Sequence, residues 1–456
     1  MNYQEFLTSK QDYGANSGFE PTFMPDYLFD FQKHLCDWAI RKGRGAIFAD
    51  CGLGKSPMSL VWSQNVIEKT NKPVLLLTPL AVSYQMLDEA NKFNIEAIRA
   101  QPDKNPTTIQ VTNYEQLHKF NANNYGGVVC DESSILKNFD GTRKSEITEF
   151  MRKAPYRLLG TATAAPNDWI ELGTSSEALG YLGHTDMLSK FFTNKRQSIS
   201  SGHGRFNRDK WRLRGWASQG PFWQWVVSWA RAARKPSDLG FDDNGFILPE
   251  LIENHTKVKA NRLPSGMLFE LAAMNFHEER EATRRTIQER CEKAAEKVIE
   301  NGTSMVWCHL NDESKLLKGL IPNSVEIKGS DKDEKKEEAA RWFCHGQEEK
   351  RVLISKPRIF GFGMNFQHCN HMTYFPTHSY EQYYQATRRL WRFGQTKPVT
   401  VDLIYTDGGE RMMGNLARKS KAADEMFTDL IQYMNQGMEI KNEYQSQKVS
   451  IPEWMK

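Results

Sequence analysis

The residues with the clearest chemistry lie in the stretch ADCGLGKS, residues 49–56. It follows the phosphate-binding pattern GxxxxGK[ST], except that alanine stands in place of the first glycine. A strand-like apolar run precedes it and a helix-like run follows, an order that lets backbone NH groups at a helix N-terminus face phosphate oxygens. Gly52 and Gly54 permit a tight loop and a close approach of phosphate. Lys55 would reach the β- and γ-phosphates and the Ser56 hydroxyl would hold Mg²⁺, so the stretch predicts a site for ATP with Mg²⁺.

A second candidate is the acidic pair that ends the apolar run VVCDE. Asp131 is suited to join Ser56 as a ligand of Mg²⁺, and Glu132 is suited to act as a base or to orient an attacking water. An acidic pair alone is a weak signal. Together with the loop it favours ATP hydrolysis over transfer of phosphate to another acceptor.

The composition indicates a globular protein without a membrane segment. The chain has 456 residues, of which 39% are hydrophobic and 25% charged, and no run of 18 apolar residues occurs. Seven cysteines at irregular spacing do not form a disulfide framework. The N-terminus lacks the basic start and apolar core of a signal peptide. We therefore expect a cytoplasmic protein with no membrane partner.

The net charge is only +4, but basic residues are concentrated between residues 190 and 235. Basic groups that neutralise phosphates, beside rings that can stack on bases, are what a nucleic-acid surface needs. Arg205, Arg208, Arg212 and Arg214 are the candidate contacts. The alternative is a solvated basic loop whose tryptophans form a small core. The tryptophans concerned are Trp211, Trp216, Trp223, Trp225 and Trp229.

Short apolar runs rich in β-branched residues alternate with helix-length segments in both halves of the chain. Near-continuous apolar strands of this kind are typical of parallel sheets covered by helices on both faces. The sequence therefore predicts an α/β protein with two lobes. The predicted strands are 45–49, 74–79, 109–113, 127–132 and 156–163 in the first half, and 305–310, 324–329, 351–356, 371–376 and 398–405 in the second.

The predicted boundaries place the first lobe at 1–178, a basic, tryptophan-rich insertion at 179–255, the second lobe at 256–430 and a tail at 431–456. A long helix is expected over 269–300, where it ends at Asn301 and Gly302. The mixed-charge run 331–338 is expected to begin another helix.

Several blocks in order resemble the superfamily-two helicase-type ATPases, most closely the Swi/Snf-type translocases on duplex DNA. The stretch 49–56 is similar to that family's DEMGLGKT, which also lacks the first glycine. Asp131 and Glu132 stand where the family has DEAH. The resemblance implies two RecA-like lobes, and it implies that Gln32 in FQKHL contacts adenine. Further blocks of the resemblance are TP (78–79), VTNYE (111–115) and LGTAT (159–163) followed by Asn167. Thr78, Thr112 and Asn113 would grip a phosphate backbone.

The most specific resemblance is QATRRLWRFGQ, residues 385–395. It matches the family pattern QAxDRxHRxGQ at six of eight fixed positions, with Arg388 for aspartate and Trp391 for histidine. Such a block supplies an arginine finger, a guanidinium that stabilises charge on the γ-phosphoryl group when the lobes close. Arg392 aligns as the finger, with Arg389 beside it.

The preceding block, GFGMN (361–365), resembles the family's GxGxN. The resemblance places Gly363 near the nucleotide and Asn365 near nucleic acid.

These features predict an ATP-driven motor that moves on nucleic acid by contacting phosphates, with duplex DNA favoured and little sequence preference. Three alternatives stay open: an RNA or single-strand helicase, a motor subunit of a restriction or defence complex, and a nucleotide-bound scaffold that does not hydrolyse ATP. Departures from the family pattern at Ser133, Ser134, Ala162 and Arg388 keep the last alternative open. Strand separation, direction, pathway and oligomeric state are not predicted.

Overall fold

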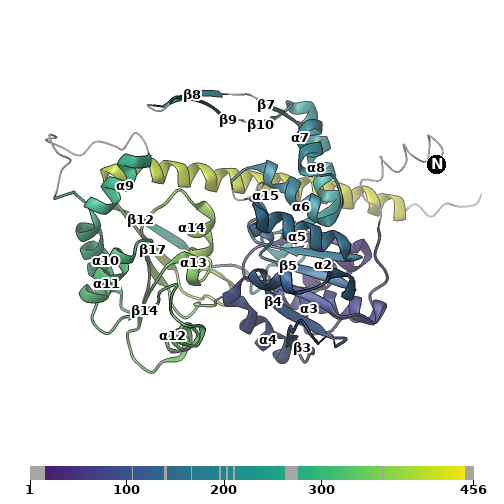
Figure 1. Cartoon of the computed structure of the whole chain (residues 1–456), viewed down its shortest axis with the longest axis horizontal. Coiled ribbons are helices and arrows are strands. Elements are labelled where there is room, and N and C mark those ends of the chain that lie inside the picture. Colours follow the sequence, from purple (N-terminus) through teal and green to yellow (C-terminus); the bar gives the residue numbers. More distant parts are fainter. Residues whose placement is uncertain are drawn as a thin grey trace, which may run out of the picture.

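The computed structural model of the chain describes residues 16–104, 106–137, 141–165, 167–194, 197–201, 204–208, 211–261, 276–360 and 364–446. Two α/β lobes lie side by side, and a long C-terminal helix runs along both of them (Figure 1). Within the described residues, no helix combines the length and apolar character needed to cross a membrane.

The first lobe is built on a seven-stranded sheet in which all neighbouring strands are parallel. Its strands are buried on both faces, which explains their near-continuous apolar sequence. In spatial order they are β11 (Ala230–Ala233), β1 (Arg44–Ala49), β6 (Tyr156–Gly160), β5 (Gly127–Asp131), β2 (Val74–Thr78), β4 (Ile109–Asn113) and β3 (Ala97–Arg99).

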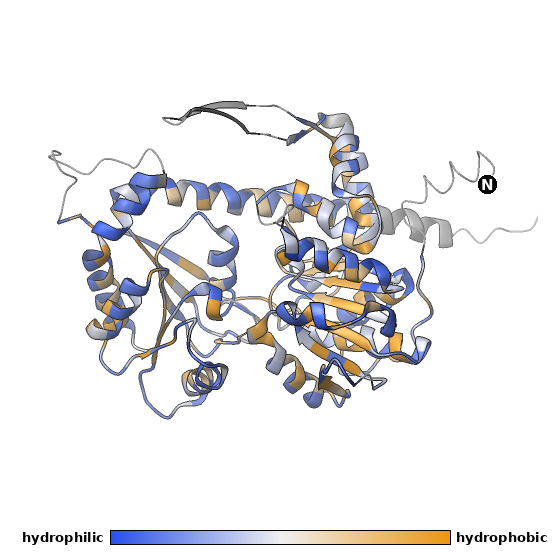
Figure 2. Cartoon of the chain, viewed as in Figure 1, coloured by the Kyte–Doolittle hydropathy of each residue, from blue (hydrophilic) through white to orange (hydrophobic). Residues whose placement is uncertain are grey.

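Alternate residues of these strands face two separate cores. Leu75 and Leu77 of β2 belong to one core, whereas Val74 and Leu76 belong to the other. One face is covered by α2 (Asp30–Lys42), α3 (Lys55–Thr70) and α4 (Ser83–Lys92). The other is covered by α5 (Thr142–Lys153), α6 (Leu172–Leu179), α7 (His184–Phe191) and α8 (Trp216–Trp229). Figure 2 shows apolar residues concentrated on the strands and hydrophilic residues on the outer sides of the helices.

The second lobe has a six-stranded sheet, again parallel throughout. In spatial order its strands are β12 (Leu251–Lys257), β17 (Val399–Tyr405), β16 (His371–Tyr374), β13 (Ser304–Trp307), β15 (Val352–Ser355) and β14 (Val325–Glu326). Its helices are α9 (Phe276–Arg285), α10 (Ile287–Asn301), α11 (Asn311–Leu320), α12 (Asp333–His345), α13 (Pro357–Phe360) and α14 (Tyr380–Thr387). Two cores again lie on the two faces of the sheet. The two parallel sheets confirm the predicted fold class of two RecA-like lobes.

All ten predicted strands are present, and α12 begins within the predicted mixed-charge run. The helix expected over 269–300 is two helices, α9 and α10, because the chain leaves helical geometry at Thr286. Short 3₁₀ helices connect several elements: η1 (Leu80–Val82), η2 (Tyr114–Lys119), η3 (Ala122–Asn124), η4 (Ser133–Lys137), η5 (Trp169–Glu171), η6 (Pro236–Leu239) and η7 (Asp407–Gly409).

The last helix, α15 (Glu410–Ser446), joins the two lobes. Leu416 near its start belongs to a core of the second lobe. Further along, Met426, Phe427 and Leu430 belong to the core of the first lobe that α8 also fills. A single helix therefore continues across the predicted boundary at residue 430 and anchors the second lobe to the first.

The segment predicted as an insertion, 179–255, contributes a strand to each of the two sheets. Its strand β11 pairs in parallel with β1 and is an edge strand of the first sheet. Its last residues belong to β12, which pairs in parallel with β17 in the second sheet. The segment that lies outside both sheets is therefore shorter than predicted.

The tryptophans of this segment are mainly core residues, but they belong to the core of the first lobe rather than to a small core of the segment itself. Trp223 and Trp229 are 0% exposed and Trp225 is 3% exposed. They pack with Phe191 and Phe222 in the core of the first lobe. Buried rings cannot stack on nucleic acid, and α8 holds them against the sheet.

Two pairs of short antiparallel strands follow α7. The strands β7 (Phe192–Asn194) and β10 (Trp211–Leu213) form one pair, and β8 (Gln197–Ser201) and β9 (Gly204–Arg208) form the other. The pair β7 and β10 extends beyond the ends of α7 and α8, away from both sheets (Figure 1).

Candidate nucleotide site

A cavity of about 380 Å³ lies between the lobes, at the carboxyl end of β1 and β5. Ligand sites in parallel sheets form at this edge. The structure brings together here nearly all residues predicted to act on ATP. They are Gln32, Gly52, Gly54, Lys55, Ser56, Asp131 and Glu132 from the first lobe and Arg389 and Arg392 from the second. The predicted Gly363 lies outside the described residues.

The two glycines of the phosphate loop have geometry that other residues adopt only with strain. Gly52 has φ 92° and Gly54 has φ 77°, both in the left-handed region. A Cβ on Gly54 would lie 2.3 Å from Nε2 of Gln32, and one on Gly52 would lie 2.9 Å from the backbone nitrogen of Phe393. The lack of a side chain at Gly54 therefore leaves room for Gln32 beside the loop. The lack of a side chain at Gly52 leaves room for Phe393 of the second lobe.

Lys55 begins α3 and its side chain turns back onto its own loop. Its Nζ donates to the carbonyl oxygens of Ala49 at 2.8 Å and Asp50 at 3.2 Å. Carbonyl groups orient an ammonium group without neutralising it. Within the described part of the chain, Lys55 has no carboxylate at ion-pair distance, so it is available to an anion.

Two further cations enter from the second lobe. Arg389 donates to the carbonyl oxygens of Gln385 at 3.1 Å and Met364 at 3.2 Å, and Arg392 donates to that of Met364 at 3.4 Å. Burial and the charge of Arg389 lower the pKa of Arg392 to about 10. The buried Nε of Arg392 has no hydrogen-bond partner. In the described residues neither guanidinium has a carboxylate partner, and such buried charges favour an anionic ligand.

The acidic pair lies opposite these cations, at the end of β5. Burial raises the pKa of Asp131 to about 7, the charge of Glu132 adds to the shift, and Lys55 opposes it. A carboxylate in this position is stabilised by a cation. Among the described residues, no group of three histidine, cysteine or acidic side chains could hold a metal ion.

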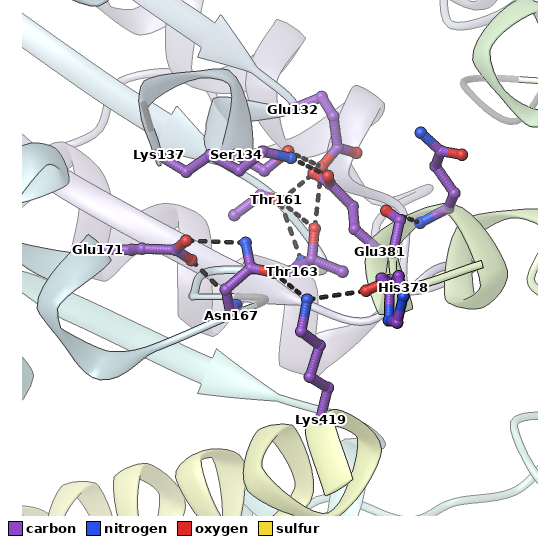
Figure 3. A network of polar contacts seen from close by, with 12 residues as sticks. Glu132, Ser134, Lys137, Thr161, Thr163, Asn167, Glu171, His378, Glu381 and Lys419 are labelled. Carbon is purple, nitrogen blue, oxygen red and sulfur yellow. Dashed lines mark hydrogen bonds and ion pairs between the residues drawn. The ribbon is translucent and has the colours of Figure 1, made fainter. Parts of the chain in front are cut away.

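Glu132 is held by the strand beside its own. Because Asp131 of β5 lies opposite Gly160 of β6, Glu132 and Thr161 leave the sheet side by side. The Glu132 carboxylate accepts hydrogen bonds from Thr161 at 2.6 Å, Ser134 at 3.1 Å and Thr163 at 3.5 Å (Figure 3). Glu132 itself has φ 55°, an uncommon geometry for a residue with a side chain. These contacts fix the carboxylate that the sequence proposes as the base.

Polar contacts continue from this point to the second lobe (Figure 3). Nδ2 of Asn167 donates to the Glu171 carboxylate at 2.9 Å, and Oδ1 of Asn167 accepts from Nζ of Lys419 of α15 at 2.8 Å. Lys419 also donates to the carbonyl oxygen of His378 at 2.8 Å. Lys137, close to Glu132 in sequence, forms an ion pair with Glu381 of α14. The surroundings of the acidic pair are thus linked to the second lobe by side chains.

No family model matches the chain. In sequence, the chain is 25% identical to the DNA annealing helicase and endonuclease ZRANB3 of Bos taurus over an alignment of 242 positions, which covers 47% of this chain and 22% of that protein. One solved structure, the SWI2/SNF2 ATPase core of Sulfolobus solfataricus in complex with double-stranded DNA, has a TM-score of 0.42 and 16% identity. That match covers 91% of this chain and 96% of the other.

The Swi/Snf-type resemblance assigns Gln32 to adenine, a role that stays a prediction. In the structure Gln32 donates to the carbonyl oxygen of Leu53 at 2.9 Å and accepts from the backbone NH of Phe29 at 3.0 Å. The side chain therefore ties the start of α2 to the phosphate loop. Each of its two polar atoms has one partner in these contacts, which leaves a second NH and a second lone pair for a ligand.

Thr78, Thr112 and Asn113, which the Swi/Snf-type resemblance assigns to nucleic acid, do not line the ATP cavity. Thr78 is 0% exposed and its hydroxyl is hydrogen-bonded to that of Ser83 at 2.8 Å, and its contact with a phosphate stays a prediction. Thr112 and Asn113 are each 7% exposed, and Asn113 accepts from the backbone NH of Gln116 at the start of η2. These three residues shape the ends of β2 and β4.

A second cavity, of about 830 Å³, also lies between the lobes. Glu132 and Pro79 line both cavities, and Asn365 lines only the larger one. Several of its basic residues are paired with acids: Arg143 with Glu115 at 3.0 Å, and Arg341 with Glu337 at 2.5 Å. This cavity therefore carries charges of both signs. Contact of Asn365 with nucleic acid stays a prediction.

The four candidate arginines of the basic segment lie far from the ATP cavity, on the short strands and their ends. Arg212 is exposed on β10, and Arg214 is the first residue after this strand. Arg214 donates to the carbonyl oxygen of Phe192 at 3.0 Å. Arg205 and Arg208 lie on β9, and their side chains lie outside the described part of the structure.

Arg388, which departs from the Swi/Snf-type pattern and has no role predicted from the sequence, reaches the phosphate loop. Its Nη2 forms an ion pair with Asp50 of that loop at 2.5 Å. The two residues are 338 positions apart in the chain. The only signal in the sequence was that a basic residue stood where the pattern has an acid.

Proposed function

We propose that this protein is an ATP-driven motor on nucleic acid, with duplex DNA as the favoured track, that hydrolyses ATP to ADP and phosphate. The observation that carries the proposal is one cavity between two parallel-sheet lobes. Among the described residues, three cations without a carboxylate at ion-pair distance, Lys55, Arg389 and Arg392, line this cavity together with the acidic pair of Asp131 and Glu132. A triphosphate supplies the negative charge that these cations lack.

Mg²⁺ fits the acidic side of the cavity. Asp131 and the Ser56 hydroxyl offer the oxygen ligands that this ion prefers, and a bound cation would offset the burial and the charge of Glu132 that raise the pKa of Asp131. When bound with the nucleotide, the ion neutralises charge on the β- and γ-phosphates. Asp131 and Ser56 would hold it in place.

The remaining chemistry belongs to the chain's own side chains. Glu132 would orient a water molecule and accept its proton, and its hydrogen bonds from Thr161 and Ser134 keep one carboxylate oxygen in place. Lys55 would bind the phosphates from the first lobe. Arg392 would stabilise the charge on the transferred phosphoryl group from the second, so turnover would require both lobes to be in place.

Movement on nucleic acid rests on the sequence blocks and on the similarity to a protein described as a DNA annealing helicase. A motor of this kind alternates the grip of its two lobes on a phosphate backbone as ATP binds and leaves. Glu132 lines both the ATP cavity and the second, larger cavity, which supports coupling between the two. The exposed Arg212 and its neighbours on the short strands are the candidate outer contact.

The decisive experiment measures phosphate release with Mg²⁺ and ATP, alone and with duplex DNA, single-stranded DNA or RNA. We expect turnover that duplex DNA raises most, and loss of turnover in Lys55→Ala. Stimulation by RNA or single strands alone would instead support a helicase on those substrates. Binding of ATP without hydrolysis under every condition would support the scaffold alternative and reject the motor.

The role of the basic segment needs a separate variant. Replacing Arg205, Arg208, Arg212 and Arg214 by glutamate removes the candidate outer contact without touching the ATP cavity. We expect weaker DNA binding, with a smaller dependence on salt, and unchanged turnover without DNA. Unchanged stimulation by DNA in this variant would reject a role of the segment in binding.

A further inference from the structure

One polar contact joins the second lobe directly to the phosphate loop. Arg388 lies just after α14 and its Nη2 reaches Oδ2 of Asp50 at 2.5 Å and the carbonyl oxygen of Cys51 at 3.0 Å. The side chain of Arg388 is 3% exposed and that of Asp50 is 13% exposed. The contact is therefore shielded from water, unlike most ion pairs on a protein surface.

Further contacts from both lobes converge on Asp50. Tyr384, one turn before Arg388 on α14, donates its hydroxyl to the other carboxylate oxygen of Asp50. The backbone NH of Cys51 donates to that same oxygen at 2.6 Å. The guanidinium of Arg388 also lies over the ring of Trp391, 4.8 Å from its centre. Burial disfavours the charged guanidinium, but Asp50 outweighs it and raises the pKa of Arg388 above its usual value.

Asp50 is well placed to transmit this contact to the phosphate site. Its carbonyl oxygen accepts from Nζ of Lys55 at 3.2 Å and from the backbone NH of Leu53 at 3.3 Å. Its backbone NH donates to the carbonyl oxygen of Ala233 on β11 at 2.9 Å. A group that holds the Asp50 side chain therefore fixes the start of the loop and an acceptor of Lys55.

We propose that Arg388 is a positioning residue: it clamps the second lobe to the phosphate loop through Asp50 and keeps the nucleotide-free protein in a nearly closed arrangement. The effect on nucleotide binding rests on the proposed function, whereas the effect on the arrangement of the lobes does not. Without the clamp, binding of ATP would have to bring the lobes together itself. The apparent affinity for ATP is the intrinsic affinity multiplied by the fraction of protein that is already closed. A smaller closed fraction therefore weakens apparent binding in proportion.

The first test measures the shape of the nucleotide-free protein by small-angle X-ray scattering. The variants are Arg388→Gln, Asp50→Asn and the double variant, with Lys397→Gln, an exposed residue in the same region, as the control. We expect each single variant to have a larger radius of gyration than the parent, and the double variant to be no larger than the singles. Circular dichroism checks that each variant is folded, and Arg388→Lys, which keeps the charge but not the planar fork, stands in if Arg388→Gln does not fold.

The second test separates a positioning role from a catalytic one. In Arg388→Gln we expect KM for ATP to rise about tenfold while kcat at saturating ATP changes by less than about threefold, because saturating nucleotide restores closure. Asp50→Asn should show the same pattern, and the two effects should not add.

The two tests distinguish failure of the clamp from failure of the proposed function. If the parent hydrolyses ATP but the radius of gyration and KM of the single variants equal those of the parent, the clamp is rejected alone. If no variant, including the parent, hydrolyses ATP, the scattering measurement still decides the clamp. Additive effects of the two single variants would also reject it, because the residues would then act independently.

Discussion

The two walls of the ATP cavity are built differently. In the first lobe each functional group is fixed by partners of that lobe: Lys55 by backbone carbonyls, and Glu132 by Thr161 and Ser134. In the second lobe Arg389 and Arg392 share a single carbonyl acceptor, that of Met364. The first wall is preorganised for phosphate and metal, whereas the second depends on where its lobe lies.

This difference implies a division of labour. The first wall can bind a nucleotide with the second lobe displaced, because its loop and acids do not need the arginines to hold their geometry. The second wall contributes charge only when closed, and an interaction made mainly in the transition state changes kcat more than binding. Variants of the two walls should therefore separate binding from turnover.

The largest effect is expected for Arg392→Ala. Loss of an arginine that stabilises the phosphoryl group lowers kcat by about 10³- to 10⁵-fold in related chemistry, and we expect a loss in that range with ATP affinity changed little. Turnover and equilibrium binding of a fluorescent ATP analogue measure the two quantities. Lys397→Ala serves as the control. If affinity fell as much as kcat, the second wall would be a binding wall and the comparison would be wrong.

Glu132→Gln should have the next largest effect. A general base contributes about 10²- to 10⁴-fold, and glutamine keeps the size and hydrogen bonding of the side chain but cannot take a proton. We expect the variant to bind ATP as the parent does and to lose turnover by this factor in a phosphate-release assay. Glu149→Gln, on the exposed face of α5, is the matched control. Turnover at the parental rate would remove Glu132 from the mechanism.

The first wall could be predicted from the sequence because its signals are local. The loop of residues 49–56 and the acids at the end of β5 each follow a buried strand, and the parallel sheet brings the ends of those strands together. Apolar strands that are buried on both faces also made both sheets visible. The fold class followed from the same signal.

What the sequence did not predict depends on contacts between distant segments or on strands with weak patterns. β12 reads LIENHTK and is mostly exposed, and β11 has four residues, so neither has the apolar run of a central strand. The tryptophans of α8 alternate with basic residues in the wider segment, and composition alone cannot tell a core helix from a binding surface. The pair of Arg388 and Asp50 joins two lobes and has no local pattern.

The titration of Asp131 offers a smaller test of the first wall. In the unfolded chain its pKa is near 3.8, and in the folded protein burial and Glu132 raise the pKa to about 7. The folded state therefore binds the proton more tightly, so stability without metal falls as pH rises from about 4 to 7 and stays low above that. We expect the thermal midpoint of the metal-free protein to decline over this range.

Asp131→Asn should remove this decline and raise the midpoint at pH 8 by about 2–4 °C, since each kcal/mol corresponds to roughly that shift in a domain of this size. Addition of Mg²⁺ and ATP should stabilise the parent at pH 8 but not the variant. Differential scanning fluorimetry from pH 5 to 8 measures both effects. An identical pH profile in the parent and in Asp131→Asn would show that Asp131 ionises normally.

The smallest effect is expected where α15 supports the second wall. Lys419 bridges Asn167 of the first lobe and the His378 carbonyl of the second, each at 2.8 Å, but it is only partly buried, and contacts of this kind contribute little individually. Because the bridge affects the position of the second lobe, as Arg388 does, Lys419→Ala should raise KM for ATP by about two- to threefold and change kcat at saturating ATP little. Lys421→Ala, two residues along α15 and exposed, is the control. A fall in kcat without a change in KM would instead place Lys419 with the groups that act in turnover, and equal behaviour of the two variants would limit the role of α15 to its apolar anchors, Met426, Phe427 and Leu430.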